Sequence, residues 1–271
     1  MAALLMLPGA DAASPAAVMH IKLTAGLTAE IYGLCDVGCV RRNNEDRLGV
    51  FTLPDGGVLM MVADGMGGHA AGEVAAQITL EAVGETACTG MSSSVPAALR
   101  SALELANHRI CREGENNPAQ RGMGTTASVL AAVEDQAWFA HIGDSRIYRL
   151  RGSRLQQLSE DHSLVAEMLR GGLLSPEDAI DHPCRNIIVR ALGIDADVHP
   201  QISGAALDVC ADDVFLLCSD GLYDQLTPGE LADLLEAPAQ AASQALVDLA
   251  RERGGADNIS VLVCRIKANA V

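Results

Sequence analysis

The fold is constrained most by a series of strand-length apolar runs, several of which contain almost no polar residue. These runs lie at 47–51, 57–63, 125–133, 137–143, 146–151, 213–219 and 258–266. Continuous apolar runs of this length are typical of β-strands that are buried on both faces. Short polar turns such as 54–57 and 133–136 join neighbouring runs, as in antiparallel hairpins. The runs therefore predict antiparallel sheets that are covered on both sides.

Segments in which apolar residues recur at helical spacing lie between the strand runs. The long helical segments lie at 70–86, 96–112 and 238–252. A shorter helical excursion is expected at about 162–182, with a helix start at Ser175 and Pro176. Helices that gather in pairs between hairpin-joined strands favour an α+β fold over a doubly wound sheet.

Length, composition and charge narrow the function classes. Apolar residues make up 49% of the 271 residues, which is enough for the core of one domain over 21–271. The sequence contains no run of about 18 uncharged apolar residues, so it predicts no membrane-spanning helix. The net charge of −16 argues against a nucleic-acid or anionic-membrane surface. Residues 1–20 are expected to be a flexible extension, with a signal peptide as the alternative, although no Lys or Arg precedes the apolar patch.

The eight cysteines do not form CxxC pairs, and several lie inside apolar runs. Cys218 and Cys264 are examples, and cysteine in such runs behaves as a small hydrophobic residue. This usage predicts a reducing, cytoplasmic location and not a disulfide framework or a zinc site.

Five acids share one local context, because each lies beside a glycine or a turn at the edge of an apolar run. They are Asp46, Asp64, Asp144, Asp220 and Asp257. Strands that bring several carboxylates to one point need a cation there, since the carboxylates otherwise repel one another. Oxygen ligands select hard ions such as Mg²⁺ or Mn²⁺. A single Asp before Gly is more often a turn residue, and spacing alone does not show that the five meet.

The glycines around Asp64 leave two interpretations open. Gly65, Gly67, Gly68 and Gly72 follow it closely. Glycine supplies backbone angles for a tight turn, and it also lets another group approach the backbone closely. The second interpretation suits a cation beside Asp64.

A series of motifs then points to a family. The stretches "RRNNED", "VADGMGGHAAGE", "GTTASV", "HIGDSRIYR", "NIIVRALG", "LLCSDGLYD" and "GGADNIS" resemble, in order, the signatures of the metal-dependent Ser/Thr protein phosphatases of the type 2C (PPM) family, and most closely its compact bacterial branch. The resemblance covers about Leu27 to Ile266. It implies a four-layer α-β-β-α sandwich of two central, mainly antiparallel sheets flanked by helix pairs, with a flap insertion at 161–186.

The resemblance also implies a metal centre. In it Asp64 bridges two Mn²⁺ or Mg²⁺ ions, and the backbone carbonyl of Gly65 binds the second ion. Asp220 and Asp257 are the other ligands of the first ion, and Asp144 is the ligand of a weaker third ion.

Other site residues follow from the same resemblance. Glu45 and Asp46 match positions that hold metal-bound waters. Arg41 matches the arginine that binds the substrate phosphate, and its planar fork suits a phosphate dianion. The neighbouring Arg42 is expected to be solvated, because the spacing favours Arg41 as the residue that reaches the site.

The chain departs from the eukaryotic relatives at the residue that follows the Asp-Gly pair. A histidine there is the general acid of those relatives, whereas this chain has Met66. His69 is the candidate replacement, since histidine titrates in the right range. A metal-bound water is the preferred alternative.

The implied activity is hydrolysis of phosphoserine and phosphothreonine by a hydroxide bridging the two ions, without a phospho-enzyme. Arg41 and Asp64 would be the catalytic residues. The implied partners are phosphorylated proteins, Ser/Thr kinases and the substrates of those kinases. One alternative is a non-catalytic phosphoprotein-binding regulator of the same fold, and another is a hydrolase of small phosphate esters.

Overall fold

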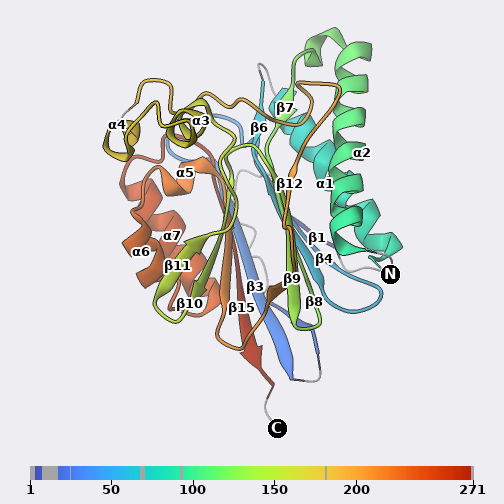
Figure 1. The fold of residues 1–271 in the computed structure, drawn as a ribbon, viewed down its shortest axis with the longest axis vertical. Coiled ribbons are helices and arrows are strands. Elements are labelled where there is room, and N and C mark those ends of the chain that lie inside the picture. Colours follow the sequence, from blue (N-terminus) through green and yellow to red (C-terminus); the bar gives the residue numbers. More distant parts are fainter. Residues whose placement is uncertain are drawn as a thin grey trace.

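The computed structural model describes residues 4–7, 18–24, 26–67, 71–91, 94–180 and 182–269, and two large sheets lie face to face at its centre (Figure 1). The first sheet has the order β1-β4-β5-β8-β9-β12, with β13 also paired to β9. Its strands are β1 (Leu4–Leu7), β4 (Arg47–Thr52), β5 (Val58–Ala63), β8 (Ala127–Val133), β9 (Gln136–Ile142), β12 (Gln201–Ile202) and β13 (Leu207–Asp208). The described pairings in this sheet are antiparallel.

The second sheet has the order β11-β10-β14-β15-β3-β2, and its described pairings are also antiparallel. Its strands are β2 (Met19–Lys22), β3 (Leu27–Asp36), β10 (Arg146–Arg151), β11 (Arg154–Gln157), β14 (Val214–Cys218) and β15 (Ile259–Ala268). A small pair, β6 (Gly65–Met66) and β7 (Gly124–Thr125), lies beside the first sheet.

Strand β5 shows why the apolar runs are continuous. Val58, Met60 and Val62 pack in the core between the two sheets. The alternate residues Leu59 and Met61 pack against the helices on the outer face. Successive side chains of a strand point to opposite faces, so a strand in a middle layer needs apolar residues on both.

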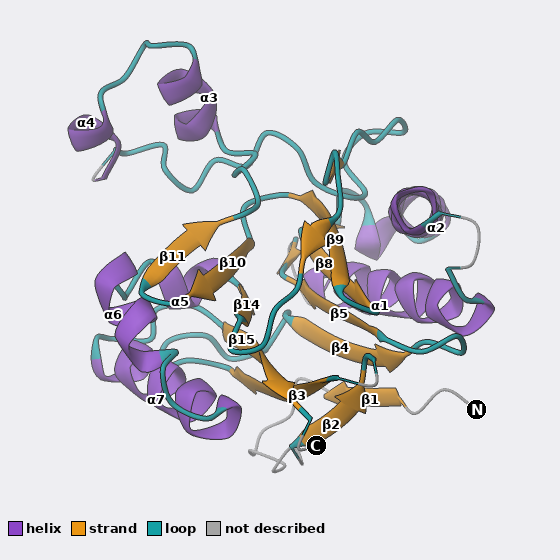
Figure 2. Ribbon diagram, turned by 60° about the horizontal axis from the view of Figure 1, so that its bottom comes forward, coloured by secondary structure: helices purple, strands orange, loops and turns teal. Residues whose placement is uncertain are grey.

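Helices cover the outer face of each sheet, which completes four layers (Figure 2). On the first sheet lie α1 (Ala71–Thr89) and α2 (Val95–Asn116), followed by the short helix η1 (Pro118–Gln120). On the second sheet lie α5 (Asp220–Tyr223), α6 (Pro228–Leu234) and α7 (Ala239–Glu252). The α+β sandwich expected from the sequence is confirmed.

Two short helices, α3 (Leu164–Arg170) and α4 (Pro176–Ile180), stand away from the sandwich in the segment expected to be a flap (Figure 2). The side chain of Ser163 caps α3, and the hydroxyl of Ser175 accepts a hydrogen bond from the backbone N–H of Asp178. We refer to residues 161–186 as the flap.

Of the stretch 1–20 that is expected to be a flexible extension, residues 1–3 and 8–17 lie outside the described residues. Leu4–Leu7 pairs with β4, and Met19 begins β2. The outer edge of β4 offers unpaired backbone groups, and the apolar Leu4–Leu7 stretch satisfies them as an added strand.

None of the helices within the described ranges combines the length and the apolar character that a membrane crossing requires.

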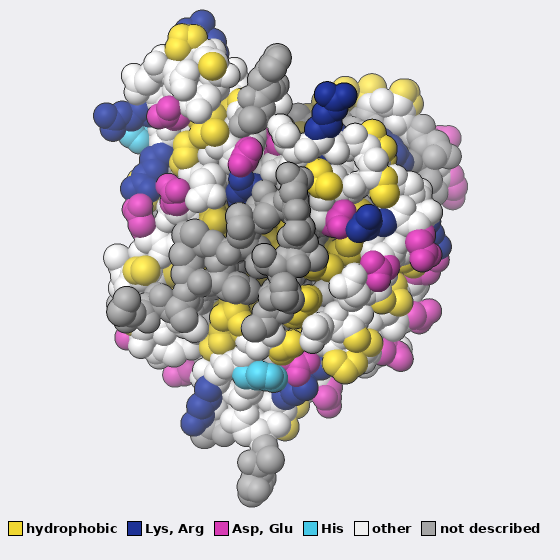
Figure 3. All heavy atoms as spheres, turned by 180° about the vertical axis from the view of Figure 1, so that it is seen from behind, with side chains coloured by type: hydrophobic (Ala, Val, Ile, Leu, Met, Phe, Trp, Pro, Cys, Tyr) yellow, Lys and Arg dark blue, Asp and Glu magenta, His cyan; other side chains and the backbone are white. Residues whose placement is uncertain are grey.

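On the face opposite to that of Figure 1, basic and acidic side chains of the described residues are interspersed (Figure 3).

Candidate metal centre

The strand register brings the five predicted acids to one end of the two sheets. Asp46 directly precedes β4 and Asp64 directly follows β5, and the pairing of Arg47 with Ala63 sets these two acids side by side. In the second sheet, the pairing of Arg146 with Cys218 places the loop of Asp144 beside the start of α5 at Asp220.

Asp257 completes the group, because it lies just before β15. Ser219, which precedes Asp220, donates its backbone N–H to Ser260 of β15. The pKa of Asp64 is raised well above its usual value by burial and then by the charges of the other four acids. The structure therefore brings together residues that lie far apart in the sequence.

Burial and mutual repulsion raise the pKa of the carboxyl groups of Asp46, Asp64, Asp144 and Asp220. Burial, followed by repulsion from Asp144, raises the pKa of Asp220 to about 8. Burial, followed by repulsion from Asp161, raises that of Asp144 to about 7. Burial raises that of Asp46 to about 6, against hydrogen bonds from serine hydroxyls. Without a cation, these groups hold protons that ordinary carboxyl groups would have lost.

Two carboxylate oxygens of the cluster have no partner in the part of the chain that the structure describes. Oδ1 of Asp46 and Oδ1 of Asp220 are buried and accept no hydrogen bond. The other oxygen of Asp46 accepts a hydrogen bond of 2.8 Å from the Ser219 hydroxyl. Within the described ranges, no three His, Cys, Asp or Glu side chains already form a set that could hold an ion. The carboxylates thus converge without forming a complete set of ligands. The two oxygens of Asp46 and Asp220 that accept no hydrogen bond within the described residues are available to a cation.

The backbone of Asp64 is held by Thr125 of β7 and by Thr126, which joins β7 to β8. Its N–H donates to the Thr126 hydroxyl over 3.0 Å, and its carbonyl oxygen accepts from the Thr125 hydroxyl over 2.8 Å. The Thr126 hydroxyl also contacts that of Ser145 at 2.6 Å. These residues lie in the quoted motifs, but no local pattern indicates that they hold Asp64.

Gly65 lies where the chain packs tightly upon itself. A Cβ atom at this position would collide with the carbonyl oxygen of Gly72 and would lie 2.8 Å from that of Glu45. Glycine is therefore required for the first turn of α1 to approach this loop. His69, the candidate general acid, lies outside the described residues.

Asn258 ties the loop that carries Arg41 and Glu45 to the start of β15. Its amide donates to the carbonyl oxygens of Val37 and Asn43, both at 3.0 Å. Its Oδ1 accepts from the backbone N–H of Glu45 at 2.9 Å. This buried side chain is a site residue that the sequence reasoning did not single out.

Arg41 lies beside the acids, and its Nη2 donates to Oδ2 of Asp257 at 2.7 Å. The Arg41 side chain is 55% exposed, so it can turn toward a ligand. Arg42 is exposed. The predicted phosphate-binding arginine and a predicted metal ligand thus pair with each other in this structure.

Two buried histidines hold the loop before Asp144. The backbone N–H of Gly143 donates to Nδ1 of His162 at 3.1 Å, and Nε2 of His141 lies 3.0 Å from the Gly143 carbonyl oxygen. Burial lowers the pKa of His141 to about 4 and that of His162 to about 3. Both rings are therefore neutral at neutral pH.

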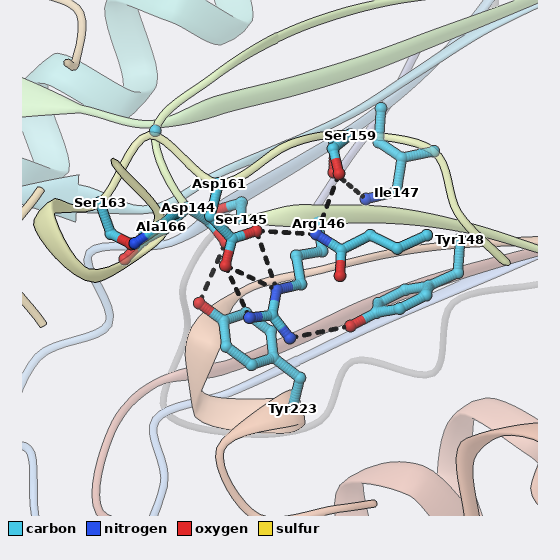
Figure 4. A network of polar contacts seen from close by, with 12 residues as sticks. Asp144, Ser145, Arg146, Ile147, Tyr148, Ser159, Asp161, Ser163, Ala166 and Tyr223 are labelled. Atoms are coloured by element: carbon cyan, nitrogen blue, oxygen red, sulfur yellow. Dashed lines mark hydrogen bonds and ion pairs between the residues drawn. The ribbon is translucent and has the colours of Figure 1, made fainter. Parts of the chain in front are cut away.

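A cavity of about 380 Å³ separates the flap from the carboxylates. It is lined by Asp144, Arg146, Asp161, Ser163, Val165, Ala166, Leu169, Ala179, Arg185, Asn186, Asp220, Tyr223 and Asp224. Figure 4 shows the polar contacts among several of these residues. The cavity opens next to two of the five acids, so a bound substrate would lie between the flap and the core.

The fold and this cluster of carboxylates define a class of protein. Residues 40–250 match the family model described as protein phosphatase 2C. The chain belongs to this family, which confirms the family expected from the motifs.

Individual relatives agree. The chain is 38% identical over 237 residues to "Protein phosphatase PhpP" of Streptococcus pneumoniae, covering 86% of this chain and 95% of that protein. It is 38% identical to "Serine/threonine phosphatase stp" of Listeria monocytogenes, covering 84% and 92%.

Solved structures of bacterial serine/threonine phosphatases have the same fold. The Mycobacterium tuberculosis phosphatase PstP/Ppp superposes with a TM-score of 0.81 at 34% identity, covering 88% of this chain and 99% of that one. The catalytic domain of PstP, solved in complex with two manganese ions, superposes with a TM-score of 0.79 at 33% identity, covering 89% and 99%.

Proposed function

We propose that this protein is a metal-dependent phosphatase that hydrolyses phosphoserine and phosphothreonine in other proteins. The observation that carries the proposal is the convergence of five acids beside Arg41 in a member of the protein phosphatase 2C family. Curated relatives with this fold are named serine/threonine phosphatases. A non-catalytic regulator would not need to retain the complete set of acids.

The residues present suit divalent cations. Within the described residues, one oxygen each of Asp46 and Asp220 accepts no hydrogen bond, and the pKa values of both groups are raised. Both features are expected of carboxylate ligands of a hard cation when the cation is not bound. When bound, two such ions, Mn²⁺ or Mg²⁺, would supply an activated water and neutralise charge on the phosphoryl group.

Each acid has a proposed place around the ions. Asp64 would be shared between the two ions, and the Gly65 carbonyl would bind the second. Asp220 and Asp257 would bind the first ion, and Asp144 would hold a weaker third. Glu45 and Asp46 would orient water at the site.

Arg41 would bind the phosphate of the substrate. A cation on Asp257 would compete with the ion pair between these two residues, and the guanidinium would then be available for the phosphoryl oxygens. Burial raises the pKa of the Cys218 thiol, two residues before Asp220, to about 12, so this cysteine is not suited to act as a nucleophile. This agrees with direct hydrolysis, without a phospho-enzyme.

The proposed partners are proteins phosphorylated on Ser or Thr, the kinases among them. The cytoplasm is the proposed location, because all eight cysteines are free.

Phosphate release from a phosphothreonine peptide tests the proposal. We expect release with Mn²⁺, none with EDTA, and a loss of about 100-fold or more in Asp64→Asn. Asp248→Asn, on the exposed face of α7, is the matched control and should keep full activity. Binding of the peptide without release would favour the regulator. Release from p-nitrophenyl phosphate alone would favour a small-ester hydrolase.

A further inference from the structure

Arg146, the first residue of β10, lies where three segments of the candidate site meet. These segments are the loop of Asp144, the beginning of the flap at Asp161, and helix α5, which starts at Asp220. The side chain of Arg146 is only 25% exposed and that of Asp161 only 14%.

The guanidinium group of Arg146 contacts each side of this junction (Figure 4). Its Nε donates to both carboxylate oxygens of Asp161 at 3.0 and 3.1 Å, and its Nη2 donates to Oδ2 at 2.6 Å. Its Nη1 donates to the Tyr148 hydroxyl at 3.1 Å. Its Cζ lies 3.6 Å from the centre of the Tyr223 ring.

Tyr223 connects Arg146 to the loop of Asp144. Its hydroxyl donates to the backbone carbonyl oxygen of Asp144 at 3.0 Å. Tyr223 is also the last residue of the four-residue helix that begins with Asp220. The stacked pair of Arg146 and Tyr223 therefore fixes the main chain on which two of the five acids lie.

Asp161 connects Arg146 to the flap. It directly precedes His162, which is hydrogen-bonded to Gly143, and Ser163, which caps α3. Both oxygens of Asp161 accept from Arg146, so the flap leaves the core at a fixed point. A planar, two-pronged donor that also stacks on an aromatic ring is a role that lysine fills poorly.

We propose that Arg146 is a positioning residue of the active site, which holds the carboxylates of Asp144 and Asp220 in place through Tyr223 and the base of the flap through Asp161. The proposal rests on the proposed function, in which these acids hold divalent cations. Arg146 is not among the proposed ligands of the ions, and its effect on Asp144 and Asp220 passes through Tyr223.

Two measurements on the full chain test this proposal. Calorimetric titration with Mn²⁺ reports on the acids, and tryptic cleavage after Arg170 in the metal-free protein reports on the flap. For Arg146→Met we expect Mn²⁺ to bind about fivefold or more weakly and the flap to be cleaved about fivefold or more faster. Arg146→Lys keeps the charge and should recover part of both losses.

Arg151→Met is the matched control. Arg151 is the last residue of the same strand, and it makes a two-pronged ion pair with the buried Asp213 at 2.6 Å, away from the flap. Both methionine variants break a two-pronged ion pair with an acid that is at most 14% exposed, and both should lose comparable stability. Only Arg146→Met should change Mn²⁺ binding and flap cleavage.

Tyr223→Phe separates the two arms of the network. It removes the hydroxyl that bonds to Asp144 but keeps the ring beneath Arg146, so it should weaken Mn²⁺ binding and leave flap cleavage unchanged. This variant and Arg146→Lys carry the test if Arg146→Met does not fold.

Three results would overturn the proposal. Arg146→Met and Arg146→Lys could match the wild type in both measurements, Arg151→Met could show the same changes as Arg146→Met, or Tyr223→Phe could bind Mn²⁺ like the wild type. If the wild-type protein bound no divalent cation, the proposed function itself would fail and this inference with it. Normal Mn²⁺ binding by every variant would reject the inference alone.

Discussion

At the scale of single residues, Gly65 links the backbone of the site to helix α1. The position next to Asp64 tolerates no side chain, because the carbonyl oxygens of Gly72 and Glu45 occupy the space that a Cβ would need. The cause is the packing of the chain against itself. A cation at the Gly65 carbonyl is a separate proposal, which this packing permits.

Gly65→Ala should therefore destabilise the protein and impair the site. Overpacking of this kind costs about 1–3 kcal/mol in the free energy of unfolding, and the displaced loop carries Asp64. Urea unfolding and Mn²⁺ titration would measure both effects. Gly204→Ala is the matched control, because a Cβ there meets no atom within 4 Å. Equal stabilities of the two variants would contradict the packing argument.

The five acids could be predicted from the sequence, whereas the residues that hold them could not. Asp64 and Asp220 stand beside glycines at the ends of apolar runs, and this is a local signal. The Thr126 hydroxyl meets the backbone N–H of Asp64, and the Ser219 hydroxyl meets the carboxylate of Asp46, only because strands pair, and a hydroxyl that bonds to a residue distant in sequence leaves no local signal. The spacing favoured Arg41 over Arg42, but its pairing with Asp257 depends on segments more than 200 residues apart.

At the scale of elements, most of the predicted strands are runs with few polar interruptions. The segment Leu27–Asp36 was missed as a strand, although it makes the longest pairing of the second sheet, with β15. Thr28 and Glu30 interrupt its apolar pattern, and Glu30 is nevertheless buried, paired with Lys267 and bonded to the backbone of α7. Tertiary partners thus compensate a charge that local patterning counts against a strand.

The loop between β3 and β4 depends on one amide side chain, that of Asn258. Asn258→Ala would remove three hydrogen bonds and lower the free energy of unfolding by about 1–3 kcal/mol. The loop carries Arg41, so we also expect a higher KM for a phosphothreonine peptide. Unfolding curves and steady-state kinetics would measure the two effects.

Asn107→Ala provides an unusually close control for that experiment. Asn107 of α2 also makes three hydrogen bonds to a loop backbone, to Gly193, Asp195 and Ala196, away from the acids. Both variants should lose similar stability, but only Asn258→Ala should raise KM. A raised KM in both would show that the effect is general loosening of the fold.

At the scale of the whole molecule, the net charge is −16, and part of the repulsion between acidic groups falls within the carboxylate cluster. Burial and repulsion raise the pKa of Asp144 to about 7 and that of Asp220 to about 8 in the folded protein. An unfolded Asp titrates near 3.9. Between these values the metal-free folded state binds more protons than the unfolded state.

The sign of the pH dependence follows. Stability falls with rising pH wherever the folded state binds more protons, by about 1.4 kcal/mol per pH unit for each fully protonated group. The buried histidines act in the opposite direction, since their lowered pKa values make stability rise with pH up to about 6.5. Between pH 7 and 8 these histidines are neutral in the folded state and mostly neutral in the unfolded state, so the carboxyl groups dominate the pH dependence of stability.

We therefore expect the metal-free protein, in EDTA, to lose stability from pH 7 to pH 8. Saturating Mn²⁺ should abolish this loss, because a cation keeps the carboxylates ionised and bound, and Mn²⁺ affinity should rise over the same interval. Asp220→Asn in EDTA should show a shallower slope, since one titrating group is gone. Urea unfolding at several pH values measures all three effects. A flat profile in EDTA would mean that the acids are not held close enough to share protons, and the site would then have to assemble around its ions.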